Sequence, residues 1–306
     1  MTEVHKGHQH TQNARANVGA TFILGVGINL AYVIFEAICG WRYNSMALLS
    51  DAGHNLTDVF SLGLSALAFR LAQKAPTHTL TYGLGKSTII ISLVNSIILL
   101  MAMGALFFEA TNRLLHPIAT SGQAIGWVAA VGIVVNAGSA LLFMRHGGEL
   151  NSRGAFLHLA GDAAVSAGVL IVGVILAYYP VHWLDAVSSM AIAIIVVVAS
   201  WNILKKSLRL SLDGVPYEHN VADIEALITK VNNVNKVHHL HIWALTTSAS
   251  ALTAHIVINE SVINKMPAIK QDIRHELATI DIHHSTLEFE FDSEKGEMCH
   301  TEHQTT

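Results

Sequence analysis

Six apolar windows, each long enough to cross a lipid bilayer, occupy the first 210 of the 306 residues of this chain. A membrane-spanning helix needs roughly 20 predominantly apolar residues. The windows run over residues 20–40, 46–70, 87–109, 122–144, 155–179 and 181–204. The residues after 210 contain no comparable window. The sequence therefore predicts a polytopic α-helical membrane protein with six transmembrane helices over residues 18–209, preceded by a polar tail over residues 1–17.

The charge content agrees with a membrane protein and disfavours several other classes. Charged residues make up 13% of the chain, against about 25% in a typical soluble domain. The net charge is −4 and no basic run is present, which disfavours a nucleic-acid partner. Cys39 and Cys299 are too few and too far apart for a disulfide framework or a zinc finger. Histidine is unusually common, with 19 residues against 18 Lys and Arg together.

The positions of Lys and Arg predict the orientation in the membrane. Of the 12 basic residues before position 210, only Arg42 and Arg113 fall on one side of the six windows, and the other 10 fall on the opposite side. Basic residues collect on the cytoplasmic side of membrane proteins. We therefore expect both termini in the cytoplasm, with the chain integral to a membrane, the bacterial inner membrane being the expected one.

Beyond residue 210 the pattern becomes that of a small acidic domain over residues 210–292. This part of the chain, with the tail that follows it, holds 6 basic against 14 acidic residues. Its segments alternate between helical and strand periods in the order α-β-β-α-β. The expected helices start near Val221 and Ser261, and the strands are KVHHLHIWAL, ALTAHIVI and STLEFEF. We expect a metallochaperone-like α+β domain with two helices on one face of a three-stranded sheet, and a loose tail over residues 293–306.

Two of the apolar windows contain the same pair of ionisable residues. The second window holds His54 and Asp58, and the fifth holds His158 and Asp162. Residues four apart share one face of a helix, and a charged group in lipid costs about 2.5–3.5 kcal/mol on insertion scales. Two imidazoles and two carboxylates form a nitrogen and oxygen ligand set that suits Zn²⁺. A proton relay without metal is the main alternative. Asp51 shares the face of His54 and is expected either to carry a proton near the site or only to supply a helix-end charge.

Several segments of the chain resemble those of a known protein family. The strings LLSDAGHNLTDV and HLAGDAAVSAGV, the six windows, and VHHLHIWAL and AHIVI are similar to the cation diffusion facilitator family, in particular its zinc-exporting branch. The resemblance extends from about residue 18 to residue 291. It implies a homodimeric antiporter of divalent metal ions and protons. The implied transport-site ligands are His54, Asp58, His158 and Asp162.

The C-terminal histidines form a second candidate metal site. In a layout of adjacent strands, His238, His255 and His283 are expected to converge at one end of the sheet, with Glu290 supplying an oxygen ligand. The family resemblance points to the same four positions as cytoplasmic zinc ligands. Whether His241, His284 or the tail residues bind metal stays open, and a solvated tail is the favoured interpretation of the tail residues: His5, His8, His10, Cys299, His300 and His303.

These observations together predict a zinc/proton antiporter that exports Zn²⁺ from the cytoplasm by alternating access. Protons and metal compete for the same imidazoles and carboxylates, so an exchange needs no ATP, and no Walker motif is present. An enzyme is not expected, because neither HNLTD nor HLAGD has the general-base Glu of a metallohydrolase. The alternatives are a transporter with another primary metal, such as Cd²⁺, Co²⁺, Fe²⁺ or Mn²⁺, and a membrane zinc sensor. Zinc bound to the acidic domain is expected to regulate the dimer.

Overall fold

The fold was analysed in a computed structural model that describes residues 27–145, 150–179 and 181–291. The described part excludes the side chains of residues 142–158. The chain divides into two compact units, one over residues 1–64 and 95–202 and the other over residues 65–94 and 203–306. Each unit is described by itself. Both tails and their histidines lie outside the described residues.

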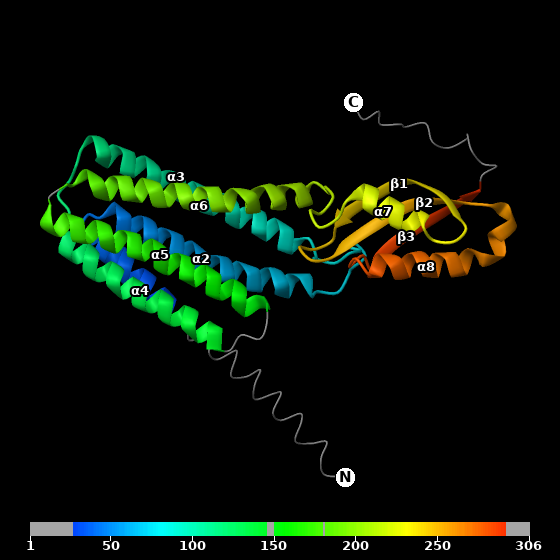
Figure 1. The fold of residues 1–306 in the computed structure, drawn as a ribbon, viewed down its shortest axis with the longest axis horizontal. Coiled ribbons are helices and arrows are strands. Elements are labelled where there is room, and N and C mark those ends of the chain that lie inside the picture. Colours follow the sequence, from blue (N-terminus) through cyan, green and yellow to red (C-terminus); the bar gives the residue numbers. More distant parts are fainter. Residues whose placement is uncertain (1–26, 146–149, 180, 292–306) are drawn as a thin grey trace, which may run out of the picture. The chain divides into compact units, whose positions relative to one another are not determined.

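Long helices account for nearly all of the first unit. A helix over residues 27–42 precedes five others that lie side by side (Figure 1). These are α2 (Met46–Ala72), α3 (Ser87–Leu115), α4 (Gly122–Arg145), α5 (Leu150–Tyr178) and α6 (Trp183–Ser211). Among the described residues, four helices are long and apolar enough to span a membrane, namely those that begin at Ser87, Gly122, Leu159 and Trp183. The α2 helix is not one of them, because its polar and ionisable residues lower its mean hydropathy, and the first expected window is described only from residue 27.

The helices α4 and α5 approach each other through glycines. A Cβ atom placed on Gly122 would lie 2.3 Å from the backbone nitrogen of Ala177, and one placed on Gly173 would lie 2.5 Å from that of Gly126. Small residues permit this close backbone contact between membrane helices. The contact fixes α5, which carries one of the predicted metal-binding pairs.

The first turn of α2 is held by a carboxylate from α6. Asp185 accepts hydrogen bonds from Ser45 Oγ at 2.6 Å, from the Met46 backbone nitrogen at 2.6 Å and from the Ala47 backbone nitrogen at 3.3 Å. The first backbone N–H groups of a helix have no partner within the helix, so an anion at this end satisfies them and favours the helix dipole. Asp185 thereby fixes the start of the helix that carries His54.

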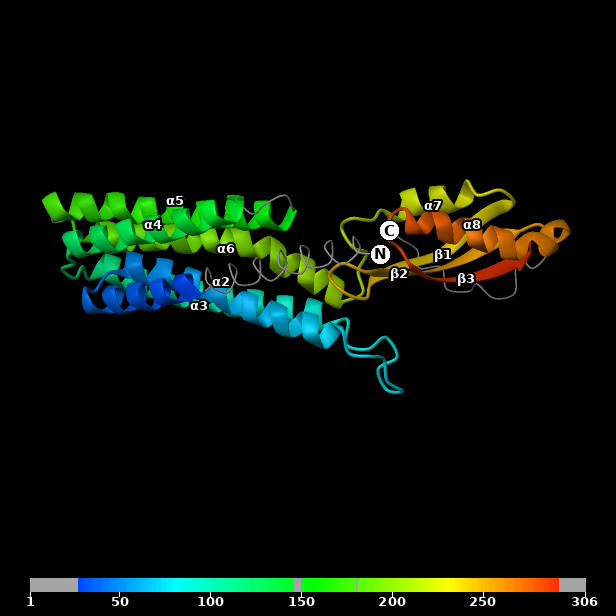
Figure 2. The same cartoon turned by 90° about the horizontal axis from the view of Figure 1, so that it is seen from below.

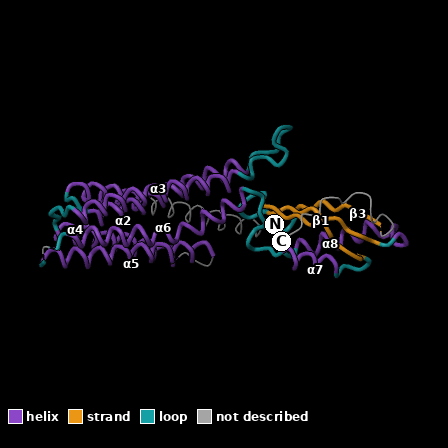
Figure 3. Tube along the Cα trace, turned by 90° about the horizontal axis from the view of Figure 1, so that it is seen from above, coloured by secondary structure: helices purple, strands orange, loops and turns teal. Residues whose placement is uncertain are grey.

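The C-terminal domain, residues 213–291, has the element order expected from the sequence. Its elements are α7 (Val221–Thr229), β1 (Val234–Ala244), β2 (Ser250–Ile258), a 3₁₀ turn η1 (Glu260–Lys265), α8 (Met266–Ala278) and β3 (His284–Phe291). The expected helix over residues 261–279 is thus a 3₁₀ turn followed by an α-helix whose first turn contains Pro267. Strand β2 is central, antiparallel to β1 and parallel to β3. Both helices cover one face of the sheet (Figures 2 and 3).

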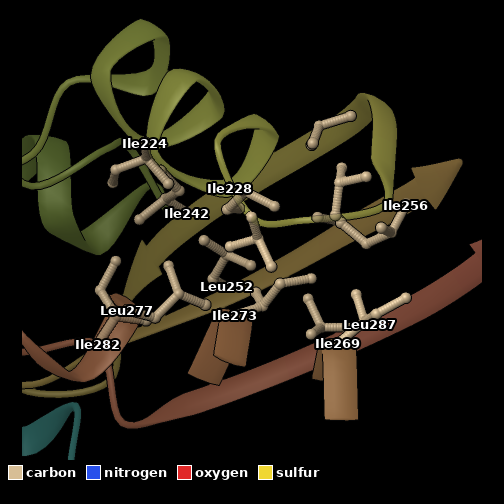
Figure 4. Close-up of a cluster of buried hydrophobic side chains, with 14 of the residues drawn as sticks. Ile224, Ile228, Ile242, Leu252, Ile256, Ile269, Ile273, Leu277, Ile282 and Leu287 are labelled. Atoms are coloured by element: carbon tan, nitrogen blue, oxygen red, sulfur yellow. The ribbon is translucent and has the colours of Figure 1, made fainter. Parts of the chain in front are cut away.

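The core of this domain lies between the sheet and its two helices (Figure 4). Ile228, Ile273 and Leu277 from the helices are fully buried against Leu252 and Ile256 of the central strand. Burying side chains of this size stabilises a fold by about 1.5–3 kcal/mol each. The core leaves the other face of the sheet available for the polar residues of the strands.

Candidate metal sites

The first candidate site brings α2 and α5 together inside the first unit. His54 Nδ1 lies 3.5 Å from Asp58 Oδ2, one turn further along the same helix, and His54 Nε2 lies 3.5 Å from Asp162 Oδ1 on α5. The side chains are 16%, 25% and 7% exposed for His54, Asp58 and Asp162, in that order. One atom from each residue lies within 4.8 Å of the others. Both imidazole nitrogens therefore face a carboxylate.

The fourth predicted ligand, His158, belongs to α5 and precedes Asp162 by four residues. Residues at this spacing lie on the same helix face. The side chain of His158 is outside the described part of the chain. The structure thus brings together three of the four predicted residues and places the fourth on the same helix as one of them.

Asp51 lies outside this cluster, although it shares the face of α2 with His54. Its carboxylate is fully buried and accepts hydrogen bonds from Asn55 Nδ2 at 3.3 Å and from Ser166 Oγ at 3.1 Å. These contacts make Asp51 part of a separate polar cluster.

The second candidate site lies in the C-terminal domain on strands β1, β2 and β3. His238 Nε2 is 2.9 Å from Glu290 Oε2, and His255 Nδ1 contacts the other oxygen of the same carboxylate. His238 and His255 are directly opposite each other in the antiparallel pair β1–β2. Burial raises the pKa of the Glu290 carboxyl group, but the hydrogen bonds to His255 and His238 outweigh this effect and hold its pKa below its ordinary value. Two imidazoles and one carboxylate are ligand types that Zn²⁺ accepts, so these three residues form a candidate metal site.

His283 does not join this cluster. The parallel pairing of β2 with β3 places His284 opposite Ala251 and Glu290 opposite Val257, so His283 lies at the far end of the strand from Glu290. The His283 side chain is 72% exposed, and its Nε2 lies 3.9 Å from Asp281 Oδ1. The expected convergence of His283 with His238 and His255 is therefore not found within one chain. The register of β3 places His283 at the opposite end of the sheet. His241 is exposed, and His284 Nε2 lies 3.4 Å from Tyr82 Oη.

His239 approaches the cluster, although strand alternation places it on the opposite face. The register of β1 shifts between His238 and His241, and His239 adopts a φ of +47°. An irregularity of this kind re-aims side chains. The His239 ring centroid is 5.2 Å from those of both His238 and His255. Glu288 also contributes, with its Oε2 3.5 Å from His255 Nε2. The consecutive histidines and the alternation of STLEFEF were the available sequence signals for these two residues.

A bundle of apolar helices with histidine and carboxylate groups inside it, joined to an α+β domain with a second such cluster, defines a membrane protein that handles metal ions. Comparison with known families agrees. The family described as "Cation efflux transmembrane domain" matches residues 22–210, and "Cation efflux protein, cytoplasmic domain" matches residues 216–290. The chain belongs to the cation efflux family. It is accordingly a transporter of divalent metal ions that acts in efflux, and not an enzyme.

Relatives of this chain match over nearly their whole length. A "Cadmium, cobalt and zinc/H(+)-K(+) antiporter" of Bacillus subtilis is 34% identical over 93% of this chain and 92% of its own. The "Metal cation efflux system protein CzcD" of Cupriavidus metallidurans is 30% identical over 93% and 90%. The "Zinc transporter ZitB" of Escherichia coli is 28% identical over 96% and 95%. Among solved structures, the metal-bound C-terminal domain of the Cupriavidus CzcD transporter matches 24% of this chain and 99% of that one at 34% identity, with a TM-score of 0.22.

Proposed function

We propose that this protein exports Zn²⁺ from the cytoplasm in exchange for protons, and that His54, Asp58, His158 and Asp162 hold the transported ion. The observation that carries the proposal is the position of His54, whose two ring nitrogens each face a carboxylate from a different part of the helix bundle. A buried imidazole between two carboxylates offers nitrogen and oxygen ligands within reach of one ion. Relatives named as zinc transporters and as antiporters of zinc and protons support the same function.

Proton exchange follows from the chemistry of these ligands. Imidazole must be neutral and carboxylate ionised to bind a metal ion, so protons and Zn²⁺ compete for the site. The ordinary pKa of imidazole is about 6.5, which lies close to the pH values of the cytoplasm and of a mildly acidic medium. A site that opens to the more acidic side takes up protons and releases Zn²⁺. The return of the protonated site to the cytoplasmic side completes an exchange driven by the proton gradient.

We further propose six membrane-spanning helices over residues 18–209, with both termini in the cytoplasm and the C-terminal domain over residues 210–292. The distribution of basic residues, 10 against 2, supports this orientation. The polar face of α2 supports its place as a spanning helix, because Asp51 and His54 have partners on α5 rather than facing lipid.

The C-terminal cluster of His238, His255 and Glu290 is proposed to bind Zn²⁺ and to regulate a homodimer, with His283 left outside the cluster within one chain. The residues after 210 carry 14 acidic against 6 basic side chains, so two copies repel each other in the absence of metal. A divalent ion bound to each copy relieves this repulsion. Cytosolic zinc is thereby coupled to the association of the two domains.

The ligand set also limits which metal ions the proposed site accepts. Nitrogen and oxygen ligands also accept Cd²⁺ and Co²⁺, and relatives are named for these ions together with zinc. Competition between unlabelled metal ions and labelled Zn²⁺ in vesicles ranks the ions. The proposal expects Zn²⁺ to compete at least as well as any other ion, and stronger competition by Cd²⁺ or Co²⁺ would favour another primary substrate.

The proposed exchange is tested by uptake of Zn²⁺ into proteoliposomes with an imposed pH gradient. Wild-type protein is expected to take up Zn²⁺ only while the lumen is more acidic, and uptake is expected to stop when the gradient is dissipated. Asp58→Ala and Asp162→Ala are expected to abolish uptake. Asp223→Ala, which removes an exposed carboxylate in α7, is the matched control and should keep it. Uptake that survives both site substitutions, or that ignores the gradient, would refute the proposal.

A further inference from the structure

A second ionisable cluster lies inside the first unit, apart from the four metal ligands. It combines Tyr32 and Glu36 from the helix over residues 27–42, Asp51 from α2 and Ser166 from α5. Glu36, Asp51 and Ser166 are fully buried, and Tyr32 is 5% exposed. Gly132 of α4 closes the cluster, since a Cβ atom at this position would lie 2.2 Å from Tyr32 Oη. Four helices thus meet around two buried carboxyl groups.

The hydrogen bonds around these carboxyl groups come from neutral donors. Tyr32 Oη donates to Glu36 Oε1 at 2.8 Å, while Ser166 and Asn55 donate to the two oxygens of Asp51. The two carboxyl groups are neighbours, because Tyr32 Oη and Ser166 Oγ, which donate to Glu36 and Asp51, would lie 2.2 Å and 3.1 Å from one Cβ atom at Gly132. Glu36 Oε2 is buried and has no N–H or O–H donor among the described residues. The described part of the chain shows no ion pair to either carboxyl group.

Two neighbouring carboxyl groups at a buried site are not both ionised, because like charges repel strongly in a medium of low dielectric constant. A fully buried carboxylate without an ion pair is also costly, so burial favours a hydrogen atom on one of the two groups. The donors supplied by Tyr32, Asn55 and Ser166 leave one oxygen of Glu36 without a partner. A single proton held between Glu36 and Asp51 satisfies both requirements.

The position of this pair connects it to the metal ligands without making it part of their cluster. Asp51 precedes His54 by three residues, a rise of about 4.5 Å along α2. On α5, Ser166 follows Asp162 by one turn, so the same two helices meet at both levels. The other titratable groups that face the pair are Tyr32 and Cys39 on the first helix, His54 on α2 and Asp162 on α5.

We propose that Glu36 and Asp51 form a proton-binding site distinct from the metal ligands, which holds one proton and releases it when a divalent cation occupies the site of His54. The inference rests on the metal–proton exchange proposed above. A divalent ion one helical turn away stabilises the second negative charge of the pair, and the linkage is reciprocal, so the proton in turn weakens metal binding. With the termini in the cytoplasm, Asp51 lies closer to the outer face than His54, which places the pair on the path of an incoming proton.

The test measures protons released per metal ion bound by the purified full-length protein in weakly buffered detergent solution with a pH indicator. Zn²⁺ is the titrant, and every variant also carries His238→Ala and His255→Ala so that the C-terminal site does not contribute. Glu36→Gln keeps the size of the side chain and its contact with Tyr32. We expect it to bind Zn²⁺ with unchanged stoichiometry and to release about one proton fewer per ion, since the pair titrates as a unit.

Two further variants make the result specific. Glu109→Gln removes a carboxyl group that pairs with Arg113 on α3, outside the cluster, so it should release as many protons as the parent protein. Glu36→Gln combined with Asp51→Asn should lose no more protons than Glu36→Gln alone, because the two residues share one. A proton count unchanged in Glu36→Gln, or a loss of Zn²⁺ binding in it, would overturn the inference. Absence of proton-coupled uptake in the wild-type protein would instead overturn the proposed function.

Discussion

His54 Nε2 lies 3.5 Å from Asp162 Oδ1, and this contact joins α2 to α5 inside the helix bundle. The same imidazole faces Asp58 through its other nitrogen. Because His54 lies between two carboxylates, we expect its chemistry to affect most strongly which ion the proposed site accepts.

Replacement of His54 by Asp is expected to change the metal preference. Oxygen ligands favour harder ions such as Mn²⁺, whereas an imidazole nitrogen favours Zn²⁺. The variant should therefore show a higher ratio of Mn²⁺ to Zn²⁺ uptake than the wild-type protein, measured in proteoliposomes with both ions present. His54→Gln, which removes the imidazole without adding a charge, is the control and should lower Zn²⁺ uptake with no gain in Mn²⁺. An unchanged ratio in His54→Asp would argue that His54 does not contact the transported ion.

The geometry of the C-terminal cluster predicts that the histidines facing Glu290 contribute to metal binding and that His283 does not. In full-length protein that carries Asp58→Ala and Asp162→Ala, the metal that remains bound at equilibrium should be held by the C-terminal domain. His238→Ala or His255→Ala is expected to weaken this binding at least tenfold, because each removes a ligand that faces Glu290. His283→Ala should leave it unchanged, since this side chain is 72% exposed and lies at the far end of β3.

Equilibrium dialysis with Zn²⁺ measures both effects. If His283→Ala weakened binding as much as His255→Ala, His283 would have to reach a metal site in a way that a single chain does not show.

The difference between the sequence interpretation and the structure has a physical cause at each position. The spacing of His54 and Asp58 within one helix is local, so the sequence was sufficient to place them on one face. The position of His283 depends on whether β3 runs parallel or antiparallel to β2, which its own alternation does not specify. The orientation of His239 depends on the irregular pairing of β1 with β2. The proximity of Glu36 to Asp51 depends on how their two helices pack, which the local sequence does not specify.

An ion pair beside the C-terminal domain predicts a dependence of stability on pH. Lys206 Nζ donates to a carboxylate oxygen of Glu218, and this contact lowers the pKa of the Glu218 carboxyl group. A carboxylate whose pKa is lower in the folded state stabilises it above the unfolded-state pKa of about 4.3, and this contribution is lost as the pH falls through the folded-state value.

Glu218→Gln should therefore lower the melting temperature slightly at pH 7, and the difference from the wild-type protein should be smaller at about pH 3, below the unfolded-state pKa. The effect is small, because exposed ion pairs contribute about 1 kcal/mol or less. Glu225→Gln, at an exposed position in α7, is the control. Thermal unfolding in detergent at both pH values measures the difference, and an equal loss at both values would show that the charge of Glu218 is not responsible.

The glycine contact between α4 and α5 predicts that one added methyl group disturbs transport. A Cβ atom on Gly173 would lie 2.5 Å from the backbone nitrogen of Gly126, a distance that forces the helices apart. Overpacking of this kind usually costs about 1–3 kcal/mol. Because α5 carries Asp162, a displaced helix also changes the separation between Asp162 and His54. Gly173→Ala is therefore expected to lower both the melting temperature and the rate of Zn²⁺ uptake. Gly168→Ala lies on the same helix with open space around its Cβ position, and should change neither.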